Sequence, residues 1–463
     1  MAGRDSVDVS VIIPARNRGA YLVETLRLLG QQTYPASRTE VVVVDDGSTD
    51  GTEALLRRQD HPFRLRYERL EESGEVFWAA RPRNAGLRAA AGRISILLDS
   101  DVFVNERFVQ AHLDHHARAA HHSPSTVGIG FIHGTAFDND ERTAGWLKPP
   151  SIAELAQLVR LEQRPPAGWK EGREDYWAAW PELSTCPVPW HFFWTGNVSF
   201  ITAAVRQQGG FDEKFRGWGG EDTDLGHRLF LDGAHFSWVP EAWAVHYPHP
   251  VRPGVEAEVK RNCHYILSKY PDSIVETVLW SIRFTRPGDI PTGLAAEAWR
   301  VSLIKQIAAA RDAYLASEVP AELPGTVLDQ IGRLPAGGAP RLWCGPRPRA
   351  LSDEGLVHSD AFGRETAGGP RERLRLLGLL TSWPDRAFAA AVAAHYWAAL
   401  PPGLVAPLLR ELGRLAPTVL LLALEQPAWR EALAQASAVS GRQPVAHQLP
   451  DGGRLLVWEV KGA

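Results

Sequence analysis

The chain has 463 residues, a formal net charge of −4 and a 44% share of hydrophobic residues. This length allows two or three domains with cores of their own, and the small net charge gives no electrostatic reason to expect nucleic acid or an anionic membrane as partner. The first residues, MAGRDSVDVS, lack an apolar signal core, and the longest apolar run, 416–425, is too short to span a bilayer. The cysteines, Cys186, Cys263 and Cys344, lie far apart and predict neither a disulfide frame nor a zinc site. We therefore expect a cytoplasmic protein without an integral membrane segment.

The first hundred residues alternate between strand and helix patterns. Apolar, β-branched runs predict strands at 7–15, 39–48 and 93–102, and an alternating run predicts a further strand at 63–70. Helical spacing predicts helices at 19–32, from Ser48 onward, and at 83–92. Such alternation with continuous apolar strands is typical of a mostly parallel sheet that is covered by helices on both faces.

Charged residues follow three of these strands. The first strand ends at Pro14 and Arg16, the second at Asp45 and Asp46, and the last at Asp99, Ser100 and Asp101. Each acid alone is compatible with a helix cap or a solvated turn. The carboxyl ends of parallel strands meet at one sheet edge, where several carboxylates repel one another unless a cation or a ligand lies among them. The pattern therefore favours a binding site.

The two aspartates of the last strand are spaced for a shared ligand. Positions i and i+2 of a strand point to the same face, so Asp99 and Asp101 can face one ligand, or diverge at the turn to serve two. Carboxylate oxygens suit Mg²⁺ or Mn²⁺, which also binds diphosphate oxygens. An isolated D-x-D is a weak signal, and this one gains weight from the strand before it.

Residues 217–229, GWGGEDTDLGHRL, combine a glycine-rich turn with three acids at the start of a helical pattern. Glycines allow the backbone to approach a ligand closely, and acidic residues are favoured in the first turn of a helix. Either a solvated charged turn or a functional carboxylate fits this segment on its own.

The sequence resembles family 2 glycosyltransferases of the GT-A fold. The matching segments are VSVIIPARNR, VVVVDDGSTDGT, RNAGLRAAAGRISILLDSD, TGNVSF and GWGGEDTDLGHRL, in the family's order, and they extend over about residues 6–250. The last segment is similar to that of β4-galactosyltransferases and of bacterial chondroitin-type enzymes. The resemblance implies a GT-A, Rossmann-like, mostly parallel sheet flanked by helices.

The resemblance also implies roles for individual residues in a donor site. The nucleotide would be bound by Pro14, Arg16, Asp45, Asp46, Asp99 and Ser100, with Arg83 near the diphosphate or the donor sugar. Gly196 and Asn197 would contact the donor sugar, and Gly219 and Gly220 would approach donor and acceptor. The implied co-substrate is a nucleotide sugar, with UDP as the expected nucleotide.

A divalent cation, Mn²⁺ or Mg²⁺, is implied as cofactor. Asp101 would bind it, together with a histidine that follows the acidic helix. His246 matches that position because it directly follows an apolar, strand-like run, and His249 is the competing candidate.

The acids after the glycine turn would supply the chemistry of transfer. A free aspartate has a pKa of about 4 and is ionised at neutral pH, so Asp222, the second acid of the pair, is expected to act as general base. Glu221 would orient donor or acceptor, Asp224 would cap or salt-bridge the helix, and Trp218 would stack on a sugar or pack in the core. Retaining enzymes with a similar Trp-Gly-Gly segment carry Glu-Asn here, so Glu-Asp implies inversion.

Two further segments have open interpretations. Residues 134–194 form an acceptor-side insertion whose tryptophans suit either acceptor binding or simple packing: Trp169, Trp177, Trp180, Trp190 and Trp194. The histidines of AHLDHHARAAHH, 111–122, follow a candidate cap, Asn105, and are expected on a solvated helix face rather than in a metal cluster.

We expect a catalytic domain at 6–282, a helical connector at 283–335 and a C-terminal α/β accessory domain at 336–463. The last of these resembles the second half of a Rossmann-like or methyltransferase domain, yet no glycine-rich fingerprint follows its first strand. A structural or acceptor-recruiting role is the interpretation that we prefer.

The leading hypothesis is a metal-dependent inverting glycosyltransferase that acts on a hydroxyl or thiol of a saccharide, natural product or peptide. A sugar nucleotidyltransferase is disfavoured because PARNRGAY is not a basic, glycine-rich loop. The remaining alternative is a non-catalytic carbohydrate- or peptide-binding protein on the same scaffold.

Overall fold

A computed structural model describes residues 7–71, 78–134, 151–162, 171–247, 253–283, 295–316, 323–334, 341–344, 356–359, 379, 385–425, 429–449 and 454–461. The chain forms two compact units. Unit 1 comprises Met1–Asn262 with Thr292–Ala298, and unit 2 comprises Cys263–Pro291 with Trp299–Ala463. In the part of the chain that the structure describes, no helix combines the length and apolarity needed to cross a membrane.

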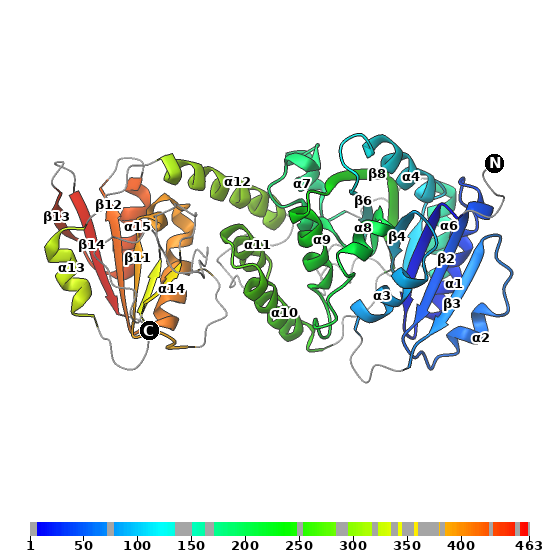
Figure 1. Ribbon diagram of the computed structural model, residues 1–463, viewed down its shortest axis with the longest axis horizontal. Helices are drawn as coiled ribbons and strands as arrows, with labels where there is room; N and C mark the ends of the chain where they lie inside the picture. The colour runs from blue at the N-terminus through cyan, green and yellow to red at the C-terminus, as the bar shows by residue number, and fades with distance from the viewer. Residues whose placement is uncertain are drawn as a thin grey trace. The chain divides into compact units, whose positions relative to one another are not determined.

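An eight-stranded sheet forms the centre of unit 1, in the order β3-β2-β1-β4-β7-β6-β8-β5 (Figure 1). Its strands are β1 (Val9–Ala15), β2 (Thr39–Asp45), β3 (Arg64–Arg69), β4 (Ile94–Leu98), β5 (Val102–Val104), β6 (Thr126–His133), β7 (Asn197–Ile201) and β8 (His235–His246). The pairs β3/β2, β2/β1, β1/β4 and β6/β8 are parallel, whereas β7 is antiparallel to both β4 and β6, and β5 to β8. The predicted α/β fold with a mostly parallel sheet is confirmed.

Helices connect and cover these strands. They are α1 (Gly19–Leu29), α2 (Thr52–Leu56), α3 (Ala80–Ala89), α4 (Phe108–Ala119), α6 (Ile152–Glu162), α7 (Glu174–Ala179), α8 (Thr202–Gln207) and α9 (Glu221–Leu231), with α10 (Val255–Lys269) continuing into unit 2. Short 3-10 helices are η1 (Ala36–Arg38), η2 (Leu183–Thr185) and η3 (Pro189–Phe192).

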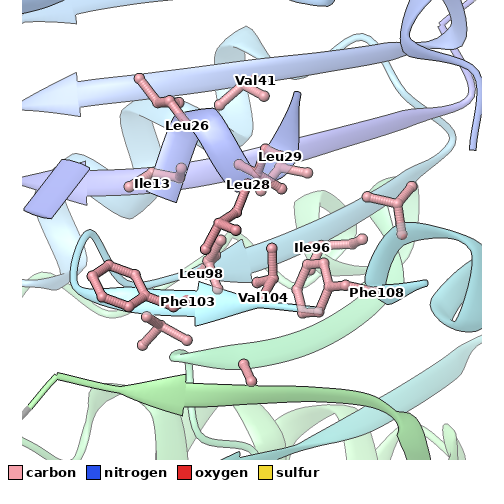
Figure 2. Packing of buried hydrophobic residues seen from close by; sticks show 14 of the residues in the cluster. Ile13, Leu26, Leu28, Leu29, Val41, Ile96, Leu98, Phe103, Val104 and Phe108 are labelled. Carbon is pink, nitrogen blue, oxygen red and sulfur yellow. The ribbon is translucent and has the colours of Figure 1, made fainter. Parts of the chain in front are cut away.

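The core of unit 1 forms because alternate strand residues face opposite helices. Ile13 and Val41 lie on the same face as Leu26 of α1, and Figure 2 shows these side chains close together. On the opposite face, α3 packs so tightly that a Cβ at Gly86 would lie 2.3 Å from the side chain of Ile12. Helices thus cover both faces of the central strands and leave their carboxyl ends as the place for a ligand.

Unit 2 contains a second sheet, in the order β10-β9-β11-β12-β14-β13. Its strands are β9 (Arg341–Cys344), β10 (Leu356–Ser359), β11 (Ala390–Ala394), β12 (Thr418–Leu424), β13 (Val445–Gln448) and β14 (Arg454–Lys461). Its helices include α11 (Ser273–Arg283), α12 (Ala295–Ala316, which begins in unit 1), α13 (Gly325–Gly332), η4 (Tyr396–Ala399), η5 (Pro402–Leu404), α14 (Val405–Leu415) and α15 (Arg430–Ser440). The predicted C-terminal α/β fold is confirmed.

Candidate active site

The ends of three neighbouring strands meet at one edge of the unit 1 sheet. Ala15, the last residue of β1, lies opposite Asp45, the last residue of β2, and β1 runs parallel to β4 on its other side. Arg16, Asp46, Asp99 and Asp101 therefore follow adjacent strands on the same edge. Pro14 is buried in β1 beside Val44. The sheet brings together the residues that the sequence predicted to converge.

The two aspartates at the end of β2 are fully buried and have different partners. Asp45 accepts hydrogen bonds from the backbone N–H of Ser48, at 2.7 Å, and from the Tyr67 hydroxyl. Asp46 faces two guanidinium groups, since its oxygens lie 3.6 Å from Nη1 of Arg16 and 3.5 Å from Nη1 of Arg81. Asp45 thus fixes the turn after β2, and Asp46 fixes two cations beside it.

Arg83 connects this edge to the acidic helix α9. Its Nη2 donates to Oδ1 of Asp99 at 3.1 Å, and its Nη1 donates to Oε1 of Glu221 at 2.8 Å. Arg83 is 5% exposed and its bond to Glu221 is buried, whereas the Asp99 side chain at the other bond is 36% exposed. One buried guanidinium therefore holds the start of α9 next to the strand end at Asp99, although 122 positions separate Asp99 from Glu221 in the sequence.

The glycine turn before α9 has a backbone that other residues adopt with difficulty. Gly217, Gly219 and Gly220 have φ values of 77°, 85° and 99°, in the region that lacks a steric penalty only for glycine. A Cβ at Gly217 would lie 2.3 Å from the Glu258 carboxylate, which accepts from the N–H of Trp218 at 2.9 Å. The turn is thus tied to α10, and Gly220 caps α9 directly before its first acid.

The adjacent acids Glu221 and Asp222 form an electrostatically strained pair. Glu221 is 5% exposed and Asp222 is half-buried. Burial, followed by the charge of Asp222, raises the pKa of Glu221, and burial also raises the pKa of Asp222. Asp222 accepts from the N–H of Thr223 at 2.7 Å, which stabilises its ionised form. Asp224 is bonded differently, because it pairs with Arg228 one turn later at 2.9 Å, as predicted.

Asp101 and His246 lie side by side where β4 leads into β5. Nε2 of His246 is 3.8 Å from Oδ1 of Asp101, and His246 is opposite Val102 in the β5/β8 pair. The N–H of Tyr247 donates to the Asp101 carbonyl at 2.9 Å, which extends the antiparallel β5/β8 pairing by one bond. His249 lies outside the described residues.

This pair fits Mg²⁺ or Mn²⁺ that takes further oxygens from a substrate. No group of three or more acidic, histidine or cysteine ligands occurs among the described residues. Such cations are often held by one or two carboxylates plus substrate phosphates, so a carboxylate–imidazole pair is sufficient in number and chemistry. The geometry therefore suits a cation that binds together with an anionic ligand.

Gly196 and Asn197, which were predicted to contact the donor sugar, differ sharply in their surroundings. A Cβ at Gly196 would lie 3.2 Å from Oδ2 of Asp99, so glycine permits the close approach of this segment to the strand end. Asn197 is fully buried. Its amide donates to the carbonyls of Phe131, at 3.0 Å, and Ala242, at 2.6 Å, and its Oδ1 lies 2.9 Å from Nε2 of His112. Asn197 is therefore corrected to a structural residue that joins β6, β7, β8 and α4.

The remaining predicted residues occupy varied positions. Trp218 is 42% exposed. Ser100 is buried, and its carbonyl accepts from the Thr25 hydroxyl at 3.0 Å. In the insertion, Trp180 and Trp190 are buried as packing residues, whereas Trp177 is 40% exposed; Trp169 lies outside the described residues.

The solvated face predicted for the α4 histidines is wrong. His112, His115 and His116 are at most 4% exposed, in contact with the sheet. Nδ1 of His116 lies 2.6 Å from the Thr126 hydroxyl and its Nε2 lies 2.9 Å from the Ser199 hydroxyl. Polar spacing in the sequence does not reveal that β6 and β7 supply hydroxyl and amide partners to this face. The Asn105 side chain does accept from the N–H of Arg107, ahead of the helix.

Sequence reasoning missed several charged residues at the site. Arg81 lies two positions before Arg83 and could have been suspected for that reason. Arg173 gave no signal: it is fully buried, donates to the Gly130 carbonyl at 2.8 Å and covers the Trp194 ring at 4.5 Å, ahead of Gly196. Arg18 lies 3.5 Å from Asp101. Only the folded chain relates Arg18 and Arg81 to the strand ends.

Two family models match this chain. Residues 10–152 match "Glycosyl transferase family 2", and residues 181–250 match "N-terminal domain of galactosyltransferase". A validoxylamine A glucosyltransferase of Streptomyces hygroscopicus subsp. limoneus is 31% identical over 82% of this chain and 82% of its own length. Chondroitin synthase of Escherichia coli is 31% identical over 55% of this chain, which spans only 36% of that protein.

Among solved structures, Staphylococcus aureus TarS is similar with a TM-score of 0.41 and 21% identity, over 61% of this chain and 45% of that chain. A mannosyltransferase from Pyrobaculum calidifontis, in complex with GDP-Man and Mn²⁺, has a TM-score of 0.37 and 21% identity, over 71% and 79% of the two chains.

A mostly parallel sheet with an acidic edge, together with the family-model match and the validoxylamine A glucosyltransferase relative, defines the protein as an enzyme of the glycosyltransferase class. The chain belongs to glycosyltransferase family 2.

Proposed function

We propose that the protein is a metal-dependent, inverting glycosyltransferase that moves a sugar from a nucleoside-diphosphate sugar, with UDP as the expected nucleotide, to an acceptor hydroxyl or thiol. The observation that carries this proposal is the Arg83 bridge. Because one guanidinium binds both Asp99 and Glu221, the first turn of α9 lies beside the acidic strand ends. A carboxylate on one side and a cation-binding pair on the other are what direct displacement at an anomeric carbon requires.

In this mechanism Asp222 acts as general base. Its carboxylate takes the proton of the acceptor group while the acceptor atom forms a bond to the anomeric carbon. The bond from that carbon to the diphosphate oxygen breaks, and its electron pair leaves with the diphosphate. Attack opposite the leaving group inverts the configuration. The half-buried position of Asp222 and its raised pKa favour proton transfer because a stronger base accepts the proton more readily.

The other residues of the site would hold the reactants. Arg83 would bind the donor near Asp99. Because Gly196 has no side chain, it would leave space for the sugar beside Asp99. Asp101 and His246 would hold Mg²⁺ or Mn²⁺, whose chemistry here is Lewis-acid stabilisation of the charge on the departing diphosphate. Trp218, exposed at the turn before α9, would stack on the acceptor.

For the acceptor, we propose a natural product related to validoxylamine A. The support is the match over most of both chains to a relative named for glucosyl transfer to validoxylamine A, compared with the partial match to chondroitin synthase. Saccharide polymers and peptides would be tested beside this natural product as alternative acceptors. Mass spectrometry of the products from UDP- and GDP-sugar panels would identify the transferred sugar and its acceptor.

The assignment of the base is tested by Asp222→Asn, which keeps the shape and removes the basic oxygen. We expect unchanged UDP binding by calorimetry and a loss of transfer of about a hundredfold or more, in the range typical of general-base catalysis. A variant that transfers sugar at the wild-type rate would refute the role of Asp222. Asp232→Asn, at the opposite end of α9, is the matched control and keeps wild-type activity.

A further inference from the structure

Arg18 is a charged residue beside the candidate cation pair to which no role has been assigned. Its Nε lies 3.5 Å from Oδ2 of Asp101, while the other oxygen of that carboxylate faces His246 at 3.8 Å. One buried carboxylate thus interacts with a guanidinium on one side and an imidazole on the other. The arrangement differs from a surface ion pair because Asp101 is only 6% exposed.

The turn that carries Arg18 is held firmly. The preceding residue, Asn17, has a φ of 54°, a conformation that asparagine tolerates better than most residues. Its N–H donates to the Ser48 hydroxyl and its Oδ1 accepts from the N–H of Thr49, both at 2.8 Å. The N–H of Gly19 donates to Asp50 at 3.1 Å. The turns after β1 and β2 are therefore bonded together, and they fix the direction in which Arg18 leaves the backbone.

The Arg18 side chain is 35% exposed, so part of the guanidinium is accessible. Among the described residues its side-chain contacts are Asp101 and the ring of Tyr21, at 5.6 Å. Because Nε faces Asp101, the terminal nitrogens remain to donate to an anion. A planar guanidinium binds phosphate oxygens in pairs, and its charge persists at every pH of interest.

We propose that Arg18 binds the diphosphate of the donor while it shares Asp101 with the divalent cation. This inference rests on the proposed function. Arg18 would then be a second positive charge at the leaving group. The proposal also predicts that binding of the divalent cation and binding of the nucleotide are thermodynamically linked. A fixed positive charge beside Asp101 and His246 repels a divalent cation until an anionic diphosphate arrives, so cation and nucleotide bind with strong positive coupling.

The test measures binding in four proteins: wild type, Arg18→Ala, Arg18→Lys and Arg27→Ala. Arg27 is the matched control because it lies on α1, the helix that begins directly after Arg18, and pairs with Glu24. The free Mn²⁺ signal in electron paramagnetic resonance gives the Kd for Mn²⁺ with and without UDP. Calorimetry gives the Kd for UDP, and for GDP, without metal.

For Arg18→Ala we expect two effects of opposite sign. Mn²⁺ binds the nucleotide-free protein about threefold to tenfold more tightly because the repulsion is gone, and UDP without metal binds about tenfold more weakly because the diphosphate loses its guanidinium. Both effects shrink as salt rises. Arg18→Lys keeps the weak Mn²⁺ binding of the wild type but restores only part of the UDP affinity. Arg27→Ala matches the wild type.

Weaker Mn²⁺ binding in Arg18→Ala, or UDP affinity equal to that of Arg27→Ala, overturns the inference. Arg18→Lys, which keeps the length and charge, guards against a result that comes from misfolding, and thermal melting checks each variant. If the wild type transfers sugar and Arg18→Ala is indistinguishable from the control, the inference fails alone. If the wild type binds neither UDP nor GDP with Mn²⁺, the proposed function fails and the inference fails with it.

Discussion

The buried histidines of α4 predict that unit 1 loses stability in mild acid. Burial lowers the pKa of His112 to about 4 and that of His115 to about 3, and it lowers that of His116 as well. The charged or titratable groups that act on His115 and His116 are all basic and disfavour a further positive charge: Arg93, Arg118, His112, His235 and, for His116, His115. Asn197 is the hydrogen-bond partner of His112. These rings are therefore neutral in the folded chain.

The sign and size of this stability loss follow from the linkage between proton binding and folding. A histidine of the unfolded chain has a pKa of about 6.5, so below that pH the unfolded state binds a proton that the folded state excludes. The stability is fully present above about pH 6.5 and is lost as the pH falls toward 4. For a folded pKa of about 4, the loss between about pH 7.5 and about pH 5 is about 2 kcal/mol. A comparable loss applies to His115.

The assay is urea unfolding of the wild type and two variants at several pH values. His112→Gln keeps an amide that can reach Asn197 and removes the titrating ring, so we expect its stability to fall by about 2 kcal/mol less on acidification. His121→Gln, exposed just beyond α4, is the control and keeps the wild-type pH dependence. Equal pH dependence in the wild type and His112→Gln would refute the reasoning.

Three further outcomes are expected. Burial and the charge of Asp222 raise the pKa of Glu221 to about 7, so Glu221→Gln removes one titration near that pH from the pH profile of kcat/KM; a profile that keeps this titration contradicts the assignment. Asn197→Ala leaves two carbonyls and an imidazole without this partner, so we expect the free energy of unfolding in urea to fall by about 3 kcal/mol. The KM for the donor stays unchanged in the folded fraction. An unchanged stability with a raised donor KM would instead support a role for Asn197 at the sugar. Trp218→Ala raises the KM for the acceptor about tenfold without changing the Kd for UDP, and Trp218→Phe preserves most of the affinity; an unchanged acceptor KM excludes stacking.

The local pattern of the sequence was sufficient for the first four strands of the unit 1 sheet, their parallel direction and the convergence of their acidic ends. Continuous apolar runs such as Val41–Val44 are compatible with a strand that is buried on both faces, and the helical segments between them require crossover connections. Such connections make the strands parallel, so their carboxyl ends share an edge. Strand direction alone, without any distance, is therefore enough to make Asp46, Asp99 and Asp101 neighbours at that edge.

Partners that are distant in the sequence were decided by the tertiary structure alone. The Arg83 bridge from Asp99 to Glu221, the burial of Asn197 and the neutral histidines of α4 all depend on which elements lie against each other. A polar side chain in a sequence carries no mark that distinguishes a solvated position from one where a neighbouring strand supplies a hydroxyl or an amide. Periodicity thus determined which elements form and how they run, whereas packing determined whether each polar group meets water, another side chain or a ligand.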